Sequence, residues 1–111
     1  MRILCLFLSL VISSYSFAGA SFTGTINKVV CHTTGISQNC QIQVNGAISS
    51  QTCGTSSWRF TFDGSTNEGK NILSILLASQ VSKQTITLGG TGQCSLASTS
   101  EDLRHAYITT N

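Results

Sequence analysis

Hydrophobic and polar residues alternate along several short stretches of this chain, which indicates a protein built mainly from β-strands. Residues 22–32, FTGTINKVVCH, are rich in β-branched side chains and predict a first strand, bent at Gly24 where a Cβ atom is absent. In residues 40–48, Ile and Val alternate with Gln, which predicts a second strand with one solvated face. A short polar turn separates the two strands, so we expect a hairpin.

The third predicted strand, residues 58–63, has an aromatic face and a polar face. The aromatic face holds Trp58, Phe60 and Phe62, and the polar face holds Arg59, Thr61 and Asp63. Three aromatic side chains in a row can be a stacking platform for a ligand, but in so small a chain they are more often core residues. We therefore expect the aromatic face to be buried and Arg59 and Thr61 to point outward.

The periodicity changes after Asp63, where a helix is predicted. Ser65, Thr66 or Asn67 can cap its first turn, and Glu68 suits the positive end of the helix dipole. Apolar residues then recur at helical spacing: Leu73, Leu76, Leu77 and Val81, with Ile72 and Ile75 beside them. So wide an apolar stripe predicts a well-buried helix.

Two further strands are predicted after the helix, at residues 84–90 and 103–110. In the last one, Ala106 and Ile108 share a face opposite Leu103, His105 and Tyr107. Three strands, a helix and two strands is the order of the OB-fold, a five-stranded barrel with the helix closing one end. An open α+β sheet with the helix across one face is the alternative.

The N-terminus has the layout of a secretory signal peptide, which we place at residues 1–20. Arg2 precedes an apolar run at residues 3–12, and the small residues Ala18 and Ala20 precede the expected cleavage before Ser21. That run is too short to cross a hydrocarbon core, which needs about 20 residues. The sequence therefore predicts one exported domain, residues 21–111, in the periplasm or outside the cell.

Four cysteines follow this leader, and an even number in an exported chain predicts two disulfides. Of the three pairings possible, we favour Cys31 with Cys40 and Cys53 with Cys94. Zinc is the competing use of cysteine, but the chain has no Cys-x-x-Cys pair. No metal or other cofactor is predicted.

Charge and chemistry give no sign of catalysis or of nucleic-acid binding. Without Arg2, five basic residues stand against four acidic ones, which leaves a net charge near +1 and no basic footprint. His32 and His105 are the only side chains suited to act as a base near neutral pH, and no nucleophile motif accompanies them. The sequence thus predicts a binding protein and no enzyme.

Neutral polar side chains gather in two predicted loops, at residues 33–39 and 49–52. Hydroxyl and amide groups suit a carbohydrate ligand, because sugars present hydroxyls and carry little charge. The loops beside the third strand and the outward residues of that strand form the predicted ligand site: Arg59, Thr61, Ser50 and Gln51. Solvated loops with no ligand have the same composition.

The chain also resembles the OB-fold B subunits of bacterial A-B toxins, most nearly the subtilase-cytotoxin and pertussis-like branch. The resemblance is carried by Cys53, Trp58, Phe60, Asp63, Gly69, Lys70, residues 73–77, Gly92, Cys94 and residues 107–109. It implies a glycan-binding subunit that assembles into a ring with its helices around a pore and joins a catalytic A subunit. A periplasmic or surface module that binds a protein, such as an inhibitor or accessory subunit, is the alternative.

Overall fold

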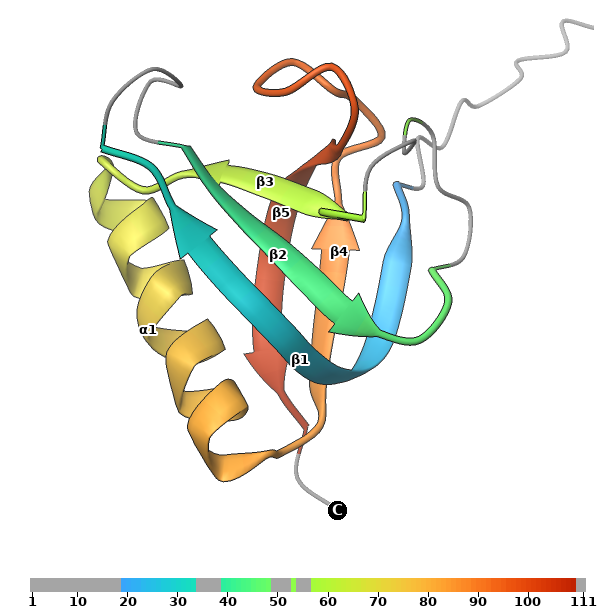
Figure 1. The fold of residues 1–111 in the computed structure, drawn as a ribbon, viewed down its shortest axis with the longest axis vertical. Coiled ribbons are helices and arrows are strands. Elements are labelled where there is room, and N and C mark those ends of the chain that lie inside the picture. The colour runs from blue at the N-terminus through green and yellow to red at the C-terminus, as the bar shows by residue number, and fades with distance from the viewer. Residues whose placement is uncertain (1–18, 34–38, 49–52, 54–56, 110–111) are drawn as a thin grey trace, which may run out of the picture.

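Five β-strands and one helix form the described part of the chain, which is residues 19–33, 39–48, 53 and 57–109 of a computed structural model. In order they are β1 (Ser21–Cys31), β2 (Asn39–Asn45), β3 (Phe60–Asp63), α1 (Asn67–Ser82), β4 (Ile86–Gly90) and β5 (Glu101–Ile108), as Figure 1 shows. The prediction of a mainly β protein with one helix between the third and fourth strands is confirmed. Most of the predicted leader lies outside the described residues.

The strands close into a ring in the order β1-β2-β3-β5-β4, with β4 returning to β1. All neighbours are antiparallel except β3 and β5, which run parallel. The open sheet is therefore excluded. Closure depends on β1, whose residues 21–24 pair with β4 while residues 25–31 pair with β2. The change of partner follows Gly24, where a bend was predicted, and the strand is visibly curved in Figure 1.

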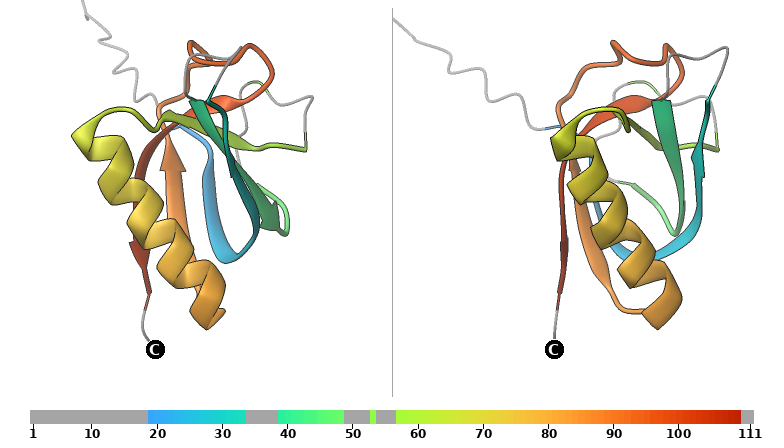
Figure 2. Two further views of the ribbon diagram at one scale, coloured as in Figure 1. Left: turned by 60° about the vertical axis from the view of Figure 1, so that its left-hand side comes forward. Right: turned by 90° about the vertical axis from the view of Figure 1, so that its left-hand side faces the viewer.

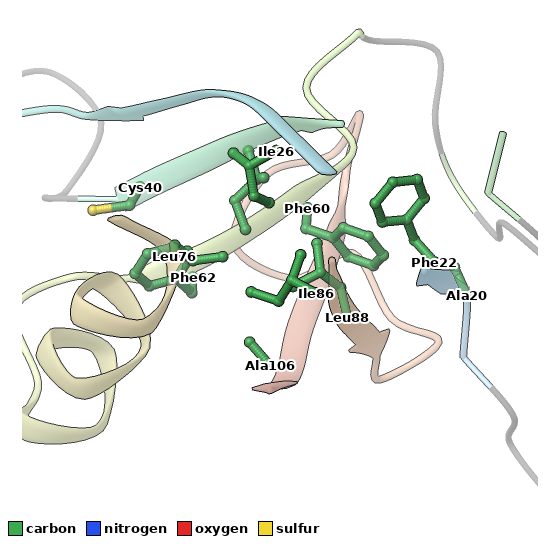
Figure 3. Close-up of a cluster of buried hydrophobic side chains, with 11 residues drawn as sticks. Ala20, Phe22, Ile26, Cys40, Phe60, Phe62, Leu76, Ile86, Leu88 and Ala106 are labelled. Carbon is green, nitrogen blue, oxygen red and sulfur yellow. The ribbon is translucent and has the colours of Figure 1, made fainter. Parts of the chain in front are cut away.

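Alternate residues of the strands fill the inside of the ring (Figure 3). Phe60 and Phe62 are buried there, and Leu76 of α1 lies beside Phe62. Trp58 is only partly buried, because β3 begins two residues later, at Phe60. The predicted burial of the aromatic face is thus confirmed for the two phenylalanines and wrong for the tryptophan.

The helix begins as its sequence predicts but is less buried than expected. Thr66 caps it, accepting a hydrogen bond at Oγ1 from the Gly69 amide at 2.9 Å. Leu77 is 44% exposed and Val81 is 83% exposed, because α1 contacts the ring on one side only, along β1 and β5 (Figure 2). Within the described residues, no helix is both long enough and apolar enough to span a membrane.

The prediction that Leu103 lies on the face opposite Ala106 and Ile108 is wrong, because β5 contains an irregularity. Gly89 pairs with His105 and Gly90 with Leu103, so Arg104 is an extra residue on the β5 side. This bulge changes the alternation, and Leu103 packs against the core while His105 and Tyr107 remain exposed. The sequence alone gave no sign of the extra residue.

Both predicted disulfides are present. Cys31 and Cys40 are directly opposite each other on β1 and β2, and their bridge closes the hairpin at its turn. Cys53 and Cys94 join the segment before β3 to the segment before β5. Such bridges suit the oxidising compartment that the predicted leader implies.

Candidate functional site

Of the four residues predicted to bind a ligand, the structure describes two, Arg59 and Thr61. Arg59 is half-buried just before β3, where its amide donates to the Ile42 carbonyl at 2.8 Å. Ser50 and Gln51 lie outside the described residues. Their proposed roles, and that of Arg59, remain predictions.

Thr61 does not have the exposure expected of it. The side chain is fully buried, and its hydroxyl contacts the Ser100 hydroxyl and accepts a hydrogen bond from Gln41 Nε2 at 3.3 Å. It does face away from the two phenylalanines, but β5 pairs alongside it and Ser100, the residue before β5, covers it. The prediction that Thr61 points to solvent is therefore wrong, and a ligand on the outer surface does not reach it.

A polar hollow lies instead where the helix ends beside the middle of β1. We name it the amide hollow, and its volume is about 370 Å³. The residues that line it are Thr25, Ile26, Asn27, Asn45, Gln80 and Lys83. Five of these six side chains are polar, and only Lys83 carries a formal charge.

The local backbone explains how these side chains come together. Thr25 and Asn45 are register partners on β1 and β2, and the register shifts between Ile26 and Lys28, so that Asn27 is an extra residue on β1. Gln80 Nε2 donates to the backbone oxygen of Asn27 at 3.1 Å. The last turn of α1 is thus joined to the bulge of β1.

The helix then ends at the rim of the hollow. Lys83 adopts the left-handed conformation with φ of 59°, and its amide donates to the Ser79 carbonyl, which caps the C-terminus of α1. Its ammonium group supplies three donors, in contrast to the amides of the neighbouring side chains.

Hydrogen bonds fix the amide groups before any ligand arrives. Asn45 Nδ2 donates to Thr25 Oγ1 at 3.0 Å, and Asn27 Nδ2 donates to Gln43 Oε1 at 3.3 Å. A side-chain amide has two donor hydrogens and an acceptor oxygen, so each group has capacity beyond the bond that orients it. The hollow can therefore present both donors and acceptors, with Ile26, which is 6% exposed, as its apolar floor.

A second hollow, of about 260 Å³, adjoins the hairpin disulfide. Its lining is Cys31, His32, Thr33, Cys40, Gly64, Ser65 and Leu73. A histidine and two hydroxyls raise the question of a catalytic serine, but Ser65 Oγ donates to Asp63 Oδ1 at 2.6 Å. The Ser65 hydroxyl lowers the pKa of Asp63, and the Ser65 amide lowers it further, so this carboxylate is a poor proton acceptor.

The turn around Asp63 instead starts the helix. Thr66 Oγ1 donates to the Asp63 carbonyl at 3.2 Å, and the same residue caps α1, which begins at Asn67. Across the described ranges, no three His, Cys, Asp or Glu side chains are grouped so that they could hold a metal ion.

Little in the sequence points to the amide hollow. Asn27 and Asn45 stand in predicted strands as ordinary outward residues, and their approach depends on the bulge in β1 and on where the helix ends. Comparisons with known protein families, with curated proteins and with solved structures found no match for this chain. The function is therefore argued from the chemistry of the hollow.

Proposed function

We propose that this chain is an exported, non-enzymatic binding module whose amide hollow receives a glycan. The observation that carries the proposal is the lining of the hollow, where hydroxyl and amide side chains from β1, β2 and α1, together with the ammonium group of Lys83, surround about 370 Å³. A sugar hydroxyl both donates and accepts hydrogen bonds, which matches groups that offer both. A nucleic acid or an anionic surface would instead select a cluster of basic residues.

Preorganisation favours such a ligand. The bonds from Asn45 to Thr25 and from Gln80 to Asn27 hold two amides in place, so binding costs less side-chain entropy than it would for free surface residues. Ile26 lines the hollow but is only 6% exposed, so contact with a ligand falls mainly to the polar side chains. Together these features support a small neutral ligand more than a large charged one.

The architecture supports the same class of function. A closed ring of five strands with a helix between β3 and β4 supports the proposal of an OB-fold, a class that often binds oligosaccharides or oligonucleotides. The resemblance to toxin B subunits adds a glycan receptor, a homo-oligomeric ring and a catalytic A subunit to the proposal. This support is analogy at the level of the fold.

A glycan array probed with the oxidised protein tests the proposal. We expect binding to at least one glycan, and Asn45→Ala or Gln80→Ala to weaken it by about tenfold, because each loses a hydrogen bond to the ligand. Asn71→Ala, on an exposed turn of α1, is the matched control and should bind normally. Arg59→Ala in the same assay tests the site expected from the sequence.

No glycan signal, or a signal that both hollow variants leave unchanged, would contradict the proposed site. Loss of binding in Arg59→Ala alone would move the site to the start of β3.

A protein partner is the second candidate, and the exposed apolar side chains favour it. Leu77 and Val81 lie on the outer side of α1, and Tyr107 of β5 is 52% exposed. A pull-down from the native host should enrich one protein, and Val81→Lys should abolish its capture. Competition by free sugars would instead assign the captured protein to the glycan site.

A further inference from the structure

Two residues that precede β1, Gly19 and Ala20, are part of the folded ring. Ala20 is 1% exposed and belongs to the core, and Figure 3 shows it beside Phe22. Its amide donates to Glu101 Oε2 at 2.8 Å, and its carbonyl accepts from the Gly90 amide at 2.8 Å. The predicted cleavage before Ser21 would remove both residues and both bonds.

Glu101 is the carboxylate around which this segment is organised. It is fully buried at the start of β5, and its Oε2 also accepts from the Gly92 amide at 2.8 Å. Burial removes the hydration of a carboxylate, and hydrogen bonds or nearby positive charge compensate for that loss. The backbone of Gly19 and Ala20 lies beside this buried group.

Gly19 packs so closely against that carboxylate that no side chain would fit at this position. A Cβ atom at this position would meet the Gly90 oxygen at 2.1 Å and Glu101 Oε2 at 2.6 Å. A Cβ atom at Gly90 would meet Oε2 at 2.0 Å. The two glycines thus allow the backbone on each side to approach the buried oxygen.

We propose that the leader is cleaved between Ala18 and Gly19, and that the new α-ammonium group of Gly19 pairs with the Glu101 carboxylate. A leader peptidase hydrolyses the peptide bond with one water molecule. The carboxylate stays on Ala18 of the released leader, and the amine stays on Gly19 and is protonated at neutral pH. Ser16 and Ala18 supply the two small residues that such a cleavage site needs.

Cleavage at this bond makes processing a part of folding. In the precursor, the Gly19 nitrogen is an uncharged amide with one hydrogen, whereas in the mature chain it carries a positive charge and three donors. The hydrogen bond from the Ala20 amide to Glu101 is kept, and the positive charge of the new N-terminus lies on Gly19, the residue before Ala20. The mature chain is therefore more stable than the precursor.

N-terminal sequencing of the protein recovered after export tests the cleavage site. We expect the chain to begin at Gly19. A chain that begins at Ser21, or one that retains its leader, would overturn the proposal.

The ion pair needs a second experiment, in which chains are released from a cleavable fusion so that they begin at Gly19 or at Ala18. We expect the unfolding equilibrium constant to be about tenfold smaller for the chain beginning at Gly19, because the added Ala18 moves the charge away from Glu101. Equal stability of the two chains would overturn the pairing, whatever happens in any Glu101 variant.

Glu101→Gln should remove the difference between the two chains, whereas Glu68→Gln, an equal loss of charge on the exposed first turn of α1, should keep it. A difference that survives Glu101→Gln would assign the effect to another group and overturn the pairing.

Discussion

At the scale of single residues, most of the buried polar groups in the described part of the chain gather where β3 meets β5. Thr61, Ser100 and Glu101 are all fully buried there, and Asn39 on the neighbouring β2 is 4% exposed. Asn39 Nδ2 donates to the Leu96 carbonyl at 3.2 Å, which attaches the segment before β5 to β2. The interior of this seam is held by hydrogen bonds as well as by apolar contact.

Thr61→Val tests whether hydrogen bonds stabilise the buried region between β3 and β5. The change keeps the shape of the side chain and removes the partner of Gln41 and Ser100, so we expect the free energy of unfolding to fall by about 1–3 kcal/mol. Urea unfolding of the oxidised protein measures it. Thr23→Val on the exposed side of β1 is the matched control and should cost roughly 0.5 kcal/mol or less. Equal effects of the two substitutions would refute a structural role for the Thr61 hydroxyl.

The sequence predicts the faces of β3 but not what covers them. Alternation places Phe60 and Phe62 together and Thr61 opposite, and the structure agrees. Whether the opposite face meets solvent depends on Ser100, which is 39 residues away along the chain. No local pattern carries that information, which is why Thr61 was expected at the surface.

At the scale of elements, the turn before α1 holds the Asp63 carboxylate, whose ionised form is favoured by two hydrogen bonds from Ser65. Its pKa is lowered first by the Ser65 hydroxyl and then by the Ser65 amide. Because the folded pKa is below the unfolded one, the stability that Asp63 adds is complete above the unfolded pKa and is lost as the pH falls through the folded pKa.

Asp63→Asn should therefore flatten the acid limb of the stability profile, measured as the free energy of unfolding from about pH 6 to about pH 2. Ser65→Ala removes the larger cause and leaves the backbone bond, so it should flatten the limb in part. An acid limb unchanged in both variants would show that this turn does not contribute.

The two disulfides should differ in what they contribute. Cys31 and Cys40 are 9 residues apart and Cys53 and Cys94 are 41 apart. Chain entropy then predicts that replacing the first pair by alanine costs about 2.5 kcal/mol and replacing the second costs about 4 kcal/mol. Thermal unfolding of the two double variants checks the order. A larger loss from the short loop would indicate that the bridge stabilises the native hairpin more than it restricts the unfolded chain.

The position of the helix was predictable, but its burial was not. Capping residues and apolar spacing identify residues 67–82 well, and Thr66 is one of the three caps expected. The stripe from Leu73 to Val81 is wider than the side of the ring that receives it, so Leu77 and Val81 are left outside. The spacing of hydrophobic residues alone does not distinguish a helix face that is buried in the core from an apolar face that remains exposed.

At the scale of the whole molecule, the exposed side of α1, with Leu77 and Val81, is a candidate contact surface for the proposed homo-oligomeric ring. If copies of the chain associate through this face, light scattering should give a mass above that of one chain, and Leu77→Lys with Val81→Lys should return it to the monomer. Gln93→Lys, an exposed position in the loop before β5, is the matched control for added charge. A wild-type monomer would contradict a toxin-like ring.

The order of elements follows from patterns that the sequence shows, and that order favours a closed ring over an open sheet, whereas the amide hollow does not follow from the sequence. The hollow needs the bulge at Asn27, the end of α1 at Lys83 and the pairing of Thr25 with Asn45, all at once. Each is a small departure from regular structure. Their coincidence is a property of the folded chain only.

The parallel seam between β3 and β5 also sets when the ring can be completed. β1, β2 and β3 are consecutive antiparallel neighbours, so they can pair before the later strands have formed. β5, the last strand, occupies the place between β3 and β4, so both of those strands keep an open edge until β5 has paired. The ring is therefore completed last by β5, after β1, β2 and β3 are able to pair with one another.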